Sequence, residues 1–170
     1  MPEYKTSRDW LIDEVNYLID QQKGYINALK DHADKTDDEE LRRNLLDFRA
    51  DHEAHRDRLQ KYLGTLKAGH LPVGLGEALG VSLGGGGVIM ESARDTDYSS
   101  LFREAVVEQA LIGAYNVLIQ VAEVLGEPEL ERICRQNMES DKRHLGYIQS
   151  CFVEQVTTFV GSIPPYEAAA

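Results

Sequence analysis

The chain has 170 residues, of which 42% are hydrophobic and 28% are charged, and its formal net charge at pH 7 is −11. This length and composition fit one globular domain covering residues 1–170. Nucleic acid is excluded as a partner, because its binders need a basic patch to displace counterions and this acidic chain has no basic run. The first ten residues, MPEYKTSRDW, lack the apolar core of a secretory signal, so we expect a cytoplasmic protein.

Two long helices are predicted in the N-terminal part of the chain, because apolar residues recur there every three or four positions. The first is expected over about residues 8–32, with either hydroxyl of the Thr-Ser pair at residues 6–7 as its N-cap. The second is expected over about residues 37–67, since Thr36 and Glu39 have the spacing of a capping box. The connection between them is short, so the two helices form an antiparallel pair.

A second antiparallel pair follows in the C-terminal part. One helix is expected over about residues 97–125, with Thr96 as its cap, and another over about residues 128–158. Gly126 lies just past the first of these helices and Pro128 lies in the first turn of the second, which is where helix ends favour these residue types. No segment has the convincing alternation of a strand.

The connection between the two pairs is long, which favours an all-α, ferritin-like four-helix bundle of two antiparallel hairpins joined by one crossover. A plain up-and-down bundle is the alternative. The crossover is apolar and rich in glycine over residues 71–90, where we expect a short helix after Pro72 and then a surface loop or dimer contact. A membrane-spanning role is not expected, because Pro72, Glu77 and the glycines at 84–87 make a poor lipid-facing helix.

Polar residues interrupt the apolar stripe of every predicted helix near its middle. From the first helix to the fourth, they are Gln22, then His52 and His55, then Glu108, then Asp141 and His144. An unpaired buried polar group costs about 1–3 kcal/mol, and a whole domain is stable by only about 5–15 kcal/mol. We therefore expect these groups to meet in the core, satisfied by hydrogen bonds or by an ion. Imidazole and carboxylate are ligands of zinc, manganese and iron.

The neighbouring polar residues receive other predictions. Glu104 flanks the apolar stripe of its helix, so we expect its carboxylate in solvent. His32 lies near a loop with no constellation of ligands around it, so no site is predicted there. Tyr25 and Tyr115 continue the stripes of the first and third helices and are expected in the core.

The bundle plan, the inward polar layer and the stretch VVEQALIGAYNVLIQVAEVLGEPELERICRQNMESDKRHL resemble the ferritin-like superfamily, with the YciE/YciF-type bacterial stress proteins as the nearest group. The resemblance implies a metal site in the core. By position, the metal ligands are His52, His55, Glu108, Asp141 and His144. Gln22 stands where that superfamily has a glutamate, and Gln22, Tyr25 and Tyr115 are expected behind the ligands.

The ligand set departs from that of a di-iron bundle, which draws a glutamate from every helix. Here only Glu108 and Asp141 bring negative charge, and two carboxylates neutralise one divalent ion better than two. Three imidazoles beside two carboxylates suit one ion of zinc, manganese or iron. A redox cycle at two irons is not expected, and whether the protein is an enzyme stays open.

Three functions stay open on the sequence. The first is a metal-binding bundle in a stress response, with the oxidase-like or ferroxidase-like chemistry that the resemblance implies. The second is a metal-free ferritin-like scaffold that works through dimer or partner contacts. The third is a protein that binds apolar ligands or membrane surfaces through residues 71–90. We rank them in this order and expect a homodimer.

Overall fold

The computed structural model describes residues 5–66 and 97–162, and in these ranges it has four α-helices and no strand. The helices are α1 (Ser7–Lys35), α2 (Glu39–Thr65), α3 (Asp97–Leu125) and α4 (Pro128–Ser162). The predictions for residues 71–90 and for a cap at Thr96 lie outside the described part of the chain.

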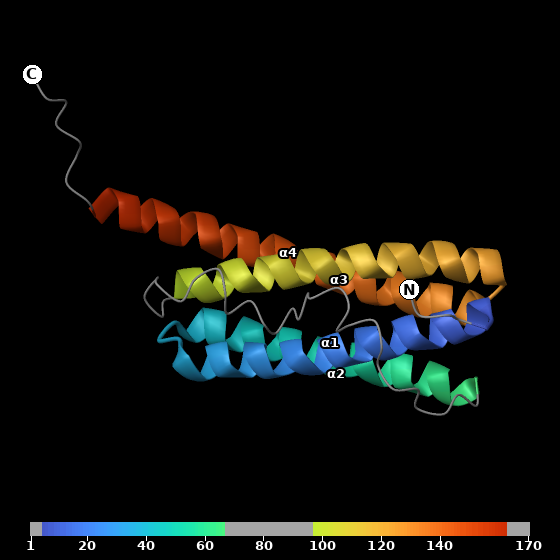
Figure 1. Ribbon diagram of the computed structural model, residues 1–170. Coiled ribbons are helices and arrows are strands. Elements are labelled where there is room, and N and C mark those ends of the chain that lie inside the picture. The colour runs from blue at the N-terminus through green and yellow to red at the C-terminus, as the bar shows by residue number, and fades with distance from the viewer. Residues whose placement is uncertain (1–4, 67–96, 163–170) are drawn as a thin grey trace, which may run out of the picture.

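The helices pair as two antiparallel hairpins, α1 with α2 and α3 with α4, which pack on one another as two layers (Figure 1). Between the layers, α1 contacts α3 and α2 contacts α4. This arrangement confirms the predicted all-α four-helix bundle. The fourth helix runs past the start of α3, where the rings of Tyr98 and Phe152 stack with their centroids 4.6 Å apart (Figure 1).

The two ends of the first hairpin are closed by side-chain caps. Thr6 is the N-cap of α1, because its hydroxyl accepts a hydrogen bond from the backbone N–H of Asp9 at 3.1 Å. The N-cap of α2 is Asp38, whose carboxylate accepts from the backbone N–H groups of Glu40 and Leu41, so the predicted capping box at Thr36 is wrong. The first helix extends to Lys35, which leaves Thr36 as its C-cap instead.

The turn between α3 and α4 follows the expected chemistry. Gly126 has a φ of 69°, in the left-handed region where a side chain would be strained, and it directly follows the last residue of α3. Pro128 is the first residue of α4, a position whose backbone N–H has no partner inside the helix. The turn therefore needs only one residue of unusual backbone conformation.

Leucine and isoleucine side chains from all four helices fill the interior above and below one polar layer. The largest fully buried aliphatic side chains are Leu11, Leu18, Leu29, Leu41, Leu45, Leu59, Leu101, Leu111, Leu130 and Ile148. Removing one such side chain to alanine costs about 2–5 kcal/mol. A rigid apolar frame thus fixes the positions of the polar groups between its halves.

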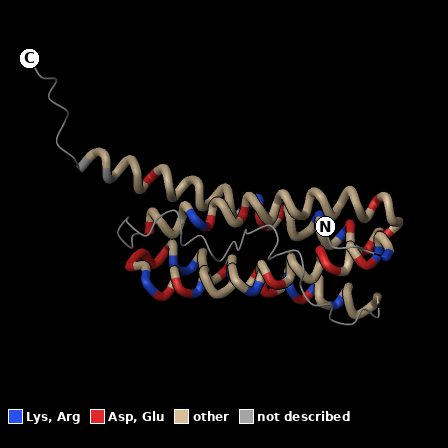
Figure 2. Tube along the Cα trace, in the orientation of Figure 1, with Lys and Arg blue, Asp and Glu red and all other residues tan. Residues whose placement is uncertain are grey.

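The most apolar helix is α3, which by length and composition alone is able to cross a membrane. Inside the bundle, 44% of its most apolar window is buried, and its inner face carries the buried carboxylates of Glu104 and Glu108. One such helix is weak evidence for a membrane span, because core helices of bundles pass the same test of length and composition. Lysine, arginine, aspartate and glutamate are plentiful along α1 and α2 and sparse along α3 (Figure 2).

Candidate metal centre

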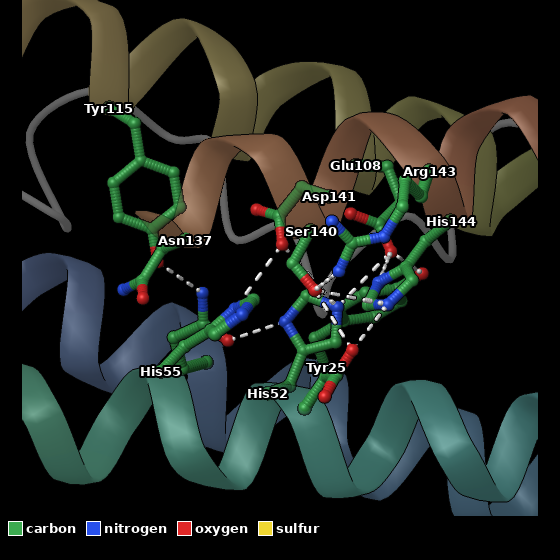
Figure 3. A network of polar contacts seen from close by, with 12 residues as sticks. Tyr25, His52, His55, Glu108, Tyr115, Asn137, Ser140, Asp141, Arg143 and His144 are labelled. Atoms are coloured by element: carbon green, nitrogen blue, oxygen red, sulfur yellow. Dashed lines mark hydrogen bonds and ion pairs between the residues drawn. The ribbon is translucent and has the colours of Figure 1, made fainter. Parts of the chain in front are cut away.

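The polar layer lies at the middle of the bundle and draws side chains from every helix (Figure 3). The second helix supplies His52 and His55, α3 supplies Glu108, and α4 supplies Asp141 and His144. Each of these five residues is at most 3% exposed. The structure therefore brings together, in the core, all five residues that the sequence predicts as metal ligands.

Four of the five approach one another closely enough to share an ion. One ligand atom from each of His52, Glu108, Asp141 and His144 can be chosen so that all four atoms lie within 4.8 Å of one another. The oxygen Oε1 of Glu108 lies 3.1 Å from Nε2 of His52 and 3.3 Å from Nδ1 of His144. From the other side, Oδ1 of Asp141 lies 4.0 Å from Nε2 of His52.

His55 lies beside this group. Its Nδ1 is 3.2 Å from Oδ1 of Asp141, but it is not among the four residues whose ligand atoms are mutually close. Burial lowers the pKa of His55 to about 2, so its imidazole is neutral at physiological pH. A neutral imidazole keeps a lone pair for a metal, and the role of His55 as a ligand stays a prediction.

Several buried atoms in this layer have no hydrogen-bond partner among residues 5–66 and 97–162. They are His55 Nδ1, Glu108 Oε2, both carboxylate oxygens of Asp141, and His144 Nδ1. Buried polar atoms are normally satisfied, and leaving each one unpaired costs about 1–3 kcal/mol. Such a concentration of free oxygen and nitrogen lone pairs at one point is what a site for a cation requires.

The imidazoles of His52 and His144 are each held by a hydrogen-bond acceptor on the side away from Glu108. Nδ1 of His52 donates to Oε1 of Gln22 at 2.7 Å, and Nε2 of His144 donates to Oδ2 of Asp51 at 3.0 Å. With these protons on the outer nitrogens, the inner nitrogen of each ring presents its lone pair to Glu108. Metal-binding histidines are oriented in the same way by acceptors outside the ligand shell.

The hydrogen bonds continue outward from Gln22. Its amide Nε2 donates to the hydroxyl of Tyr115 at 2.9 Å, and that hydroxyl also accepts from Nδ2 of Asn137 at 3.1 Å. The hydroxyl of Tyr25 donates to Oε1 of Glu108 at 3.2 Å. The three residues expected behind the ligands, Gln22, Tyr25 and Tyr115, thus lie in hydrogen-bonded positions around the centre.

Burial disfavours the charged forms of the Glu108 and Asp141 carboxylates. Burial raises the pKa of Glu108 to about 8 and the pKa of Asp141 to about 6. Every ion pair that the described residues form with these two carboxylates comes from a histidine, not from a lysine or arginine. The site therefore favours either protons or a bound cation, because two bare negative charges in the core are costly.

Sequence patterns missed a second polar cluster at one end of the bundle. Nδ1 of His32 lies 2.7 Å from Oε1 of Glu104, and Nε2 lies 3.2 Å from Oδ1 of Asp97. The prediction that Glu104 is solvated is wrong, since only 4% of this residue is exposed. Glu104 precedes Glu108 by one helical turn and follows Leu101 by three residues, so it shares their inward face.

Sequence reasoning also missed Asp51 and Ser140, which complete the centre on the side of α2 and α4. The hydroxyl of Ser140 donates to Oδ2 of Asp51 at 2.8 Å, and the same oxygen accepts from His144. A heptad signal was available: Asn44, Asp51 and Arg58 recur every seven residues, and each bonds a side chain of α4.

These features define an all-α bundle protein with a candidate metal centre in its core. The chain belongs to the family described as Domain of unknown function (DUF892), which matches residues 6–160. A search of the curated proteins finds no match.

Similar solved structures include the E. coli stress protein YciF, with a TM-score of 0.74 and 17% identity over 91% of this chain and 99% of that chain. A protein of Xanthomonas campestris pv. campestris has a TM-score of 0.74 and 16% identity, covering 92% of this chain and 97% of its own. YcfI of Rhodopseudomonas palustris has a TM-score of 0.68 and 20% identity, covering 87% and 96%. At these identities the likeness shows the fold alone.

Proposed function

We propose that this protein is a ferritin-like bundle that binds one divalent metal ion, with His52, Glu108, Asp141 and His144 as its ligands. One observation carries the proposal: these four buried residues offer ligand atoms within 4.8 Å of one another. Buried atoms of Glu108, Asp141 and His144 that lack a hydrogen bond from any described residue support it, because one cation is able to coordinate them together.

The dimensions of the site fit an ion after a small movement. Nitrogen and oxygen ligands lie about 2.0–2.2 Å from zinc, so two ligands of one ion are at most about 4.4 Å apart. The distances from Glu108 to His52 and His144, at 3.1 and 3.3 Å, lie inside this limit. The distance from Asp141 to His52, at 4.0 Å, also lies inside it, and the group as a whole spans at most 4.8 Å, so a small inward movement of the side chains suffices.

Charge favours one ion. Two ionised carboxylates balance one divalent cation, and the neutral imidazoles add ligands without adding charge. A mixed set of two imidazoles and two carboxylates suits zinc, manganese or ferrous iron, whereas magnesium and calcium prefer oxygen ligands. His55 is a further ligand for an ion that takes more than four.

A role in a stress response is part of the proposal and is supported by the likeness to the E. coli stress protein YciF. Because the identity is 17%, this support concerns the family setting and not the chemistry at the centre. The metal-free scaffold is the competing function, and the metal content of the protein separates the two.

The test is elemental analysis of protein expressed in media supplemented separately with iron, manganese and zinc. The wild type is expected to carry about one ion per chain in at least one medium. Glu108→Gln is expected to carry none, because it removes the negative charge and one oxygen of the carboxylate that lies nearest both histidines. Glu104→Gln is the matched control, since Glu104 is a buried glutamate of the same helix outside the four-ligand group. It is expected to keep the ion.

A wild-type protein without stoichiometric metal, which also fails to bind added Zn²⁺, Mn²⁺ or Fe²⁺, would end the proposal. Equal metal contents in Glu108→Gln and the wild type would place the ion elsewhere. The first result favours the scaffold function.

A further inference from the structure

A buried metal centre requires a path by which an ion reaches it. The four ligands of the proposed site are 0% exposed at His52, Glu108 and Asp141 and 3% exposed at His144. An ion therefore has to pass between helices. The side chains that contact the ligands from outside show which seam between helices is the most polar.

Two sides of the centre differ in how they are closed. On the side of α1 and α3, the ligands are backed by Gln22, Tyr25 and Tyr115, all of which are buried. On the side of α2 and α4, Asp51 contacts His144 directly, and 49% of its side chain is exposed. Among the described residues that bond to the four ligands, Asp51 is the one that reaches water.

Asp51 and Glu108 lie on opposite sides of one imidazole. Oδ2 of Asp51 is 3.0 Å from Nε2 of His144, and Nδ1 of the same ring is 3.3 Å from Oε1 of Glu108. The ring of His144 stacks on Phe48, with centroids 4.1 Å apart. Solvent, Asp51, His144 and Glu108 thus follow one another in a row.

We propose that the divalent ion enters and leaves through the seam between α2 and α4, with the Asp51 carboxylate as its first protein ligand and His144 as the side chain it passes. The proposal rests on the metal-binding function proposed above. Oδ2 of Asp51 accepts hydrogen bonds from Ser140 at 2.8 Å and from His144 at 3.0 Å, which fix the half-exposed carboxylate at the edge of the seam.

Two positively charged side chains also lie at this seam. The guanidinium of Arg143 donates to Oγ of Ser140 at 3.3 Å, beside the Asp51 carboxylate, and Figure 3 shows Arg143 next to His144. Arg58 lies farther along the seam, where its Nε donates to Asn137 at 2.9 Å. Asp51 attracts an incoming cation and Arg143 repels it, so the two residues have opposite effects on the rate of uptake.

A competing route lies along α1 and α3. The cluster of His32, Glu104 and Asp97 leads from the end of the bundle toward Glu108, and Oε2 of Glu104 has no hydrogen-bond partner in the described part of the chain. The side chain of His32 blocks this route with a ring that is 5% exposed and bonded to a carboxylate on each side. The experiment therefore includes a variant of each route.

The test is stopped-flow mixing of metal-free protein with Co²⁺, whose visible absorption reports binding to nitrogen and oxygen ligands. Asp51→Asn is expected to lower both the association and the dissociation rate by about tenfold, so that Kd changes little, because a gate acts on passage in both directions. Asp51→Glu, which keeps the charge, is expected to restore the association rate. Arg143→Gln is expected to raise it about threefold at low ionic strength and to have no effect at high salt.

The control for lost negative charge is Asp57→Asn, an exposed acidic residue of α2 whose carboxylate pairs with Arg56. It is expected to leave both rates unchanged. Co²⁺ titration of each variant at equilibrium gives Kd, and circular dichroism verifies that each is folded.

Two results would overturn the route. If Asp51→Asn raises the dissociation rate and leaves association unchanged, then Asp51 only orients His144. If His32→Gln slows uptake and Asp51→Asn does not, the ion travels along α1 and α3. A wild type that binds no Co²⁺ refutes the metal-binding function itself, which is a different outcome from either.

Discussion

Glu108 is held in the core by two histidines and a tyrosine, none of which brings a permanent positive charge. Burial raises its pKa to about 8, so the metal-free protein keeps a proton on Glu108 at neutral pH. A bound divalent ion replaces that proton. Metal binding and proton release are therefore coupled at this residue.

The stability of the metal-free protein is expected to fall as pH rises from 6.5 to 8. In this range the folded chain holds a proton on Glu108 that the unfolded chain, with an ordinary pKa of 4.5, has released. The depressed pKa values of His52 and His55 act in the opposite sense, but only below their ordinary value of 6.5. Urea unfolding of chelator-treated protein at several pH values measures the slope.

Glu108→Gln, which carries no titrating group, should make this fall in stability smaller, and the part that remains is due to His32, whose raised pKa acts in the same sense. An unchanged slope in the variant would assign the pH dependence to other residues. In the wild type, added Zn²⁺ or Mn²⁺ should raise the Tm more at pH 8 than at pH 6, because fewer protons then compete for the same oxygens.

Gln22→Leu tests the residues behind the ligands. The substitution removes the acceptor for the Nδ1 proton of His52, so that the ring is no longer held in the orientation that points Nε2 at Glu108. Metal affinity is expected to fall by about 10–100-fold with the stoichiometry unchanged, as measured by competition with a chelating dye. The control is Asn16→Leu, which removes a buried amide of α1 whose Nδ2 donates to the carbonyl of Ile12 on the same helix. Equal affinities in the two variants would contradict the role of Gln22.

At the scale of helices, periodicity predicted the elements and their inward faces well, because the apolar stripes repeat over many turns. The caps depended on single residues and were less predictable. Thr36 and Glu39 satisfy the capping-box pattern, yet Asp38 lies between them and caps α2. A pattern of two residues does not reveal where the preceding helix ends. Because α1 extends to Lys35, Thr36 is its C-cap and Asp38 becomes the N-cap of α2.

The candidate centre was predictable because its members interrupt the apolar stripes at one level of the bundle. Glu104 was not, since Ala105 offered a more apolar choice for the same stripe. Asp51 was not either, because it lies at the border of the inward face and is paired across the seam with α4. Partners contributed by another helix leave no trace in local periodicity.

His32 ties α1 to α3 through two carboxylates, Glu104 and Asp97. His32→Leu leaves Glu104 buried without its partner and is expected to lower the free energy of unfolding by about 3–5 kcal/mol. Burial opposes protonation of His32, but Glu104 and then Asp97 raise its pKa above the ordinary 6.5. The stabilisation is therefore complete below pH 6.5 and is lost as pH rises through the raised pKa.

The control for His32 is Lys30→Leu, which removes an exposed ion pair with Asp34 on the same helix. Exposed pairs contribute little, so a change of less than about 1 kcal/mol is expected. Chemical denaturation at pH 6 and pH 8 measures both variants, and a similar loss in the two would contradict the role of the buried cluster.

At the scale of the molecule, charge is unevenly distributed over the bundle (Figure 2). No charged residue occurs between positions 109 and 122 of α3, and Val117 is 55% exposed there. In a twofold dimer the same surface of both chains meets, and a surface of α3 without charges brings no like charges together there. We expect the homodimer to use this face, so that Val117→Glu shifts the mass measured by light scattering to that of a monomer.

The control for the dimer is Val160→Glu on α4, where an equally exposed valine lies outside this face. It is expected to leave the mass unchanged. A wild type with the mass of a single chain would contradict the homodimer.

The four proposed ligands are unequally divided between the two hairpins: His52 comes from α2, and the other three come from α3 and α4. A bound ion therefore cross-links the hairpin of α1 and α2 to the hairpin of α3 and α4 through His52. With the ion in place, the halves separate only after the bond to His52 breaks. Without it, the first hairpin can detach at a lower cost, and slow hydrogen exchange of its amides becomes a measure of occupancy.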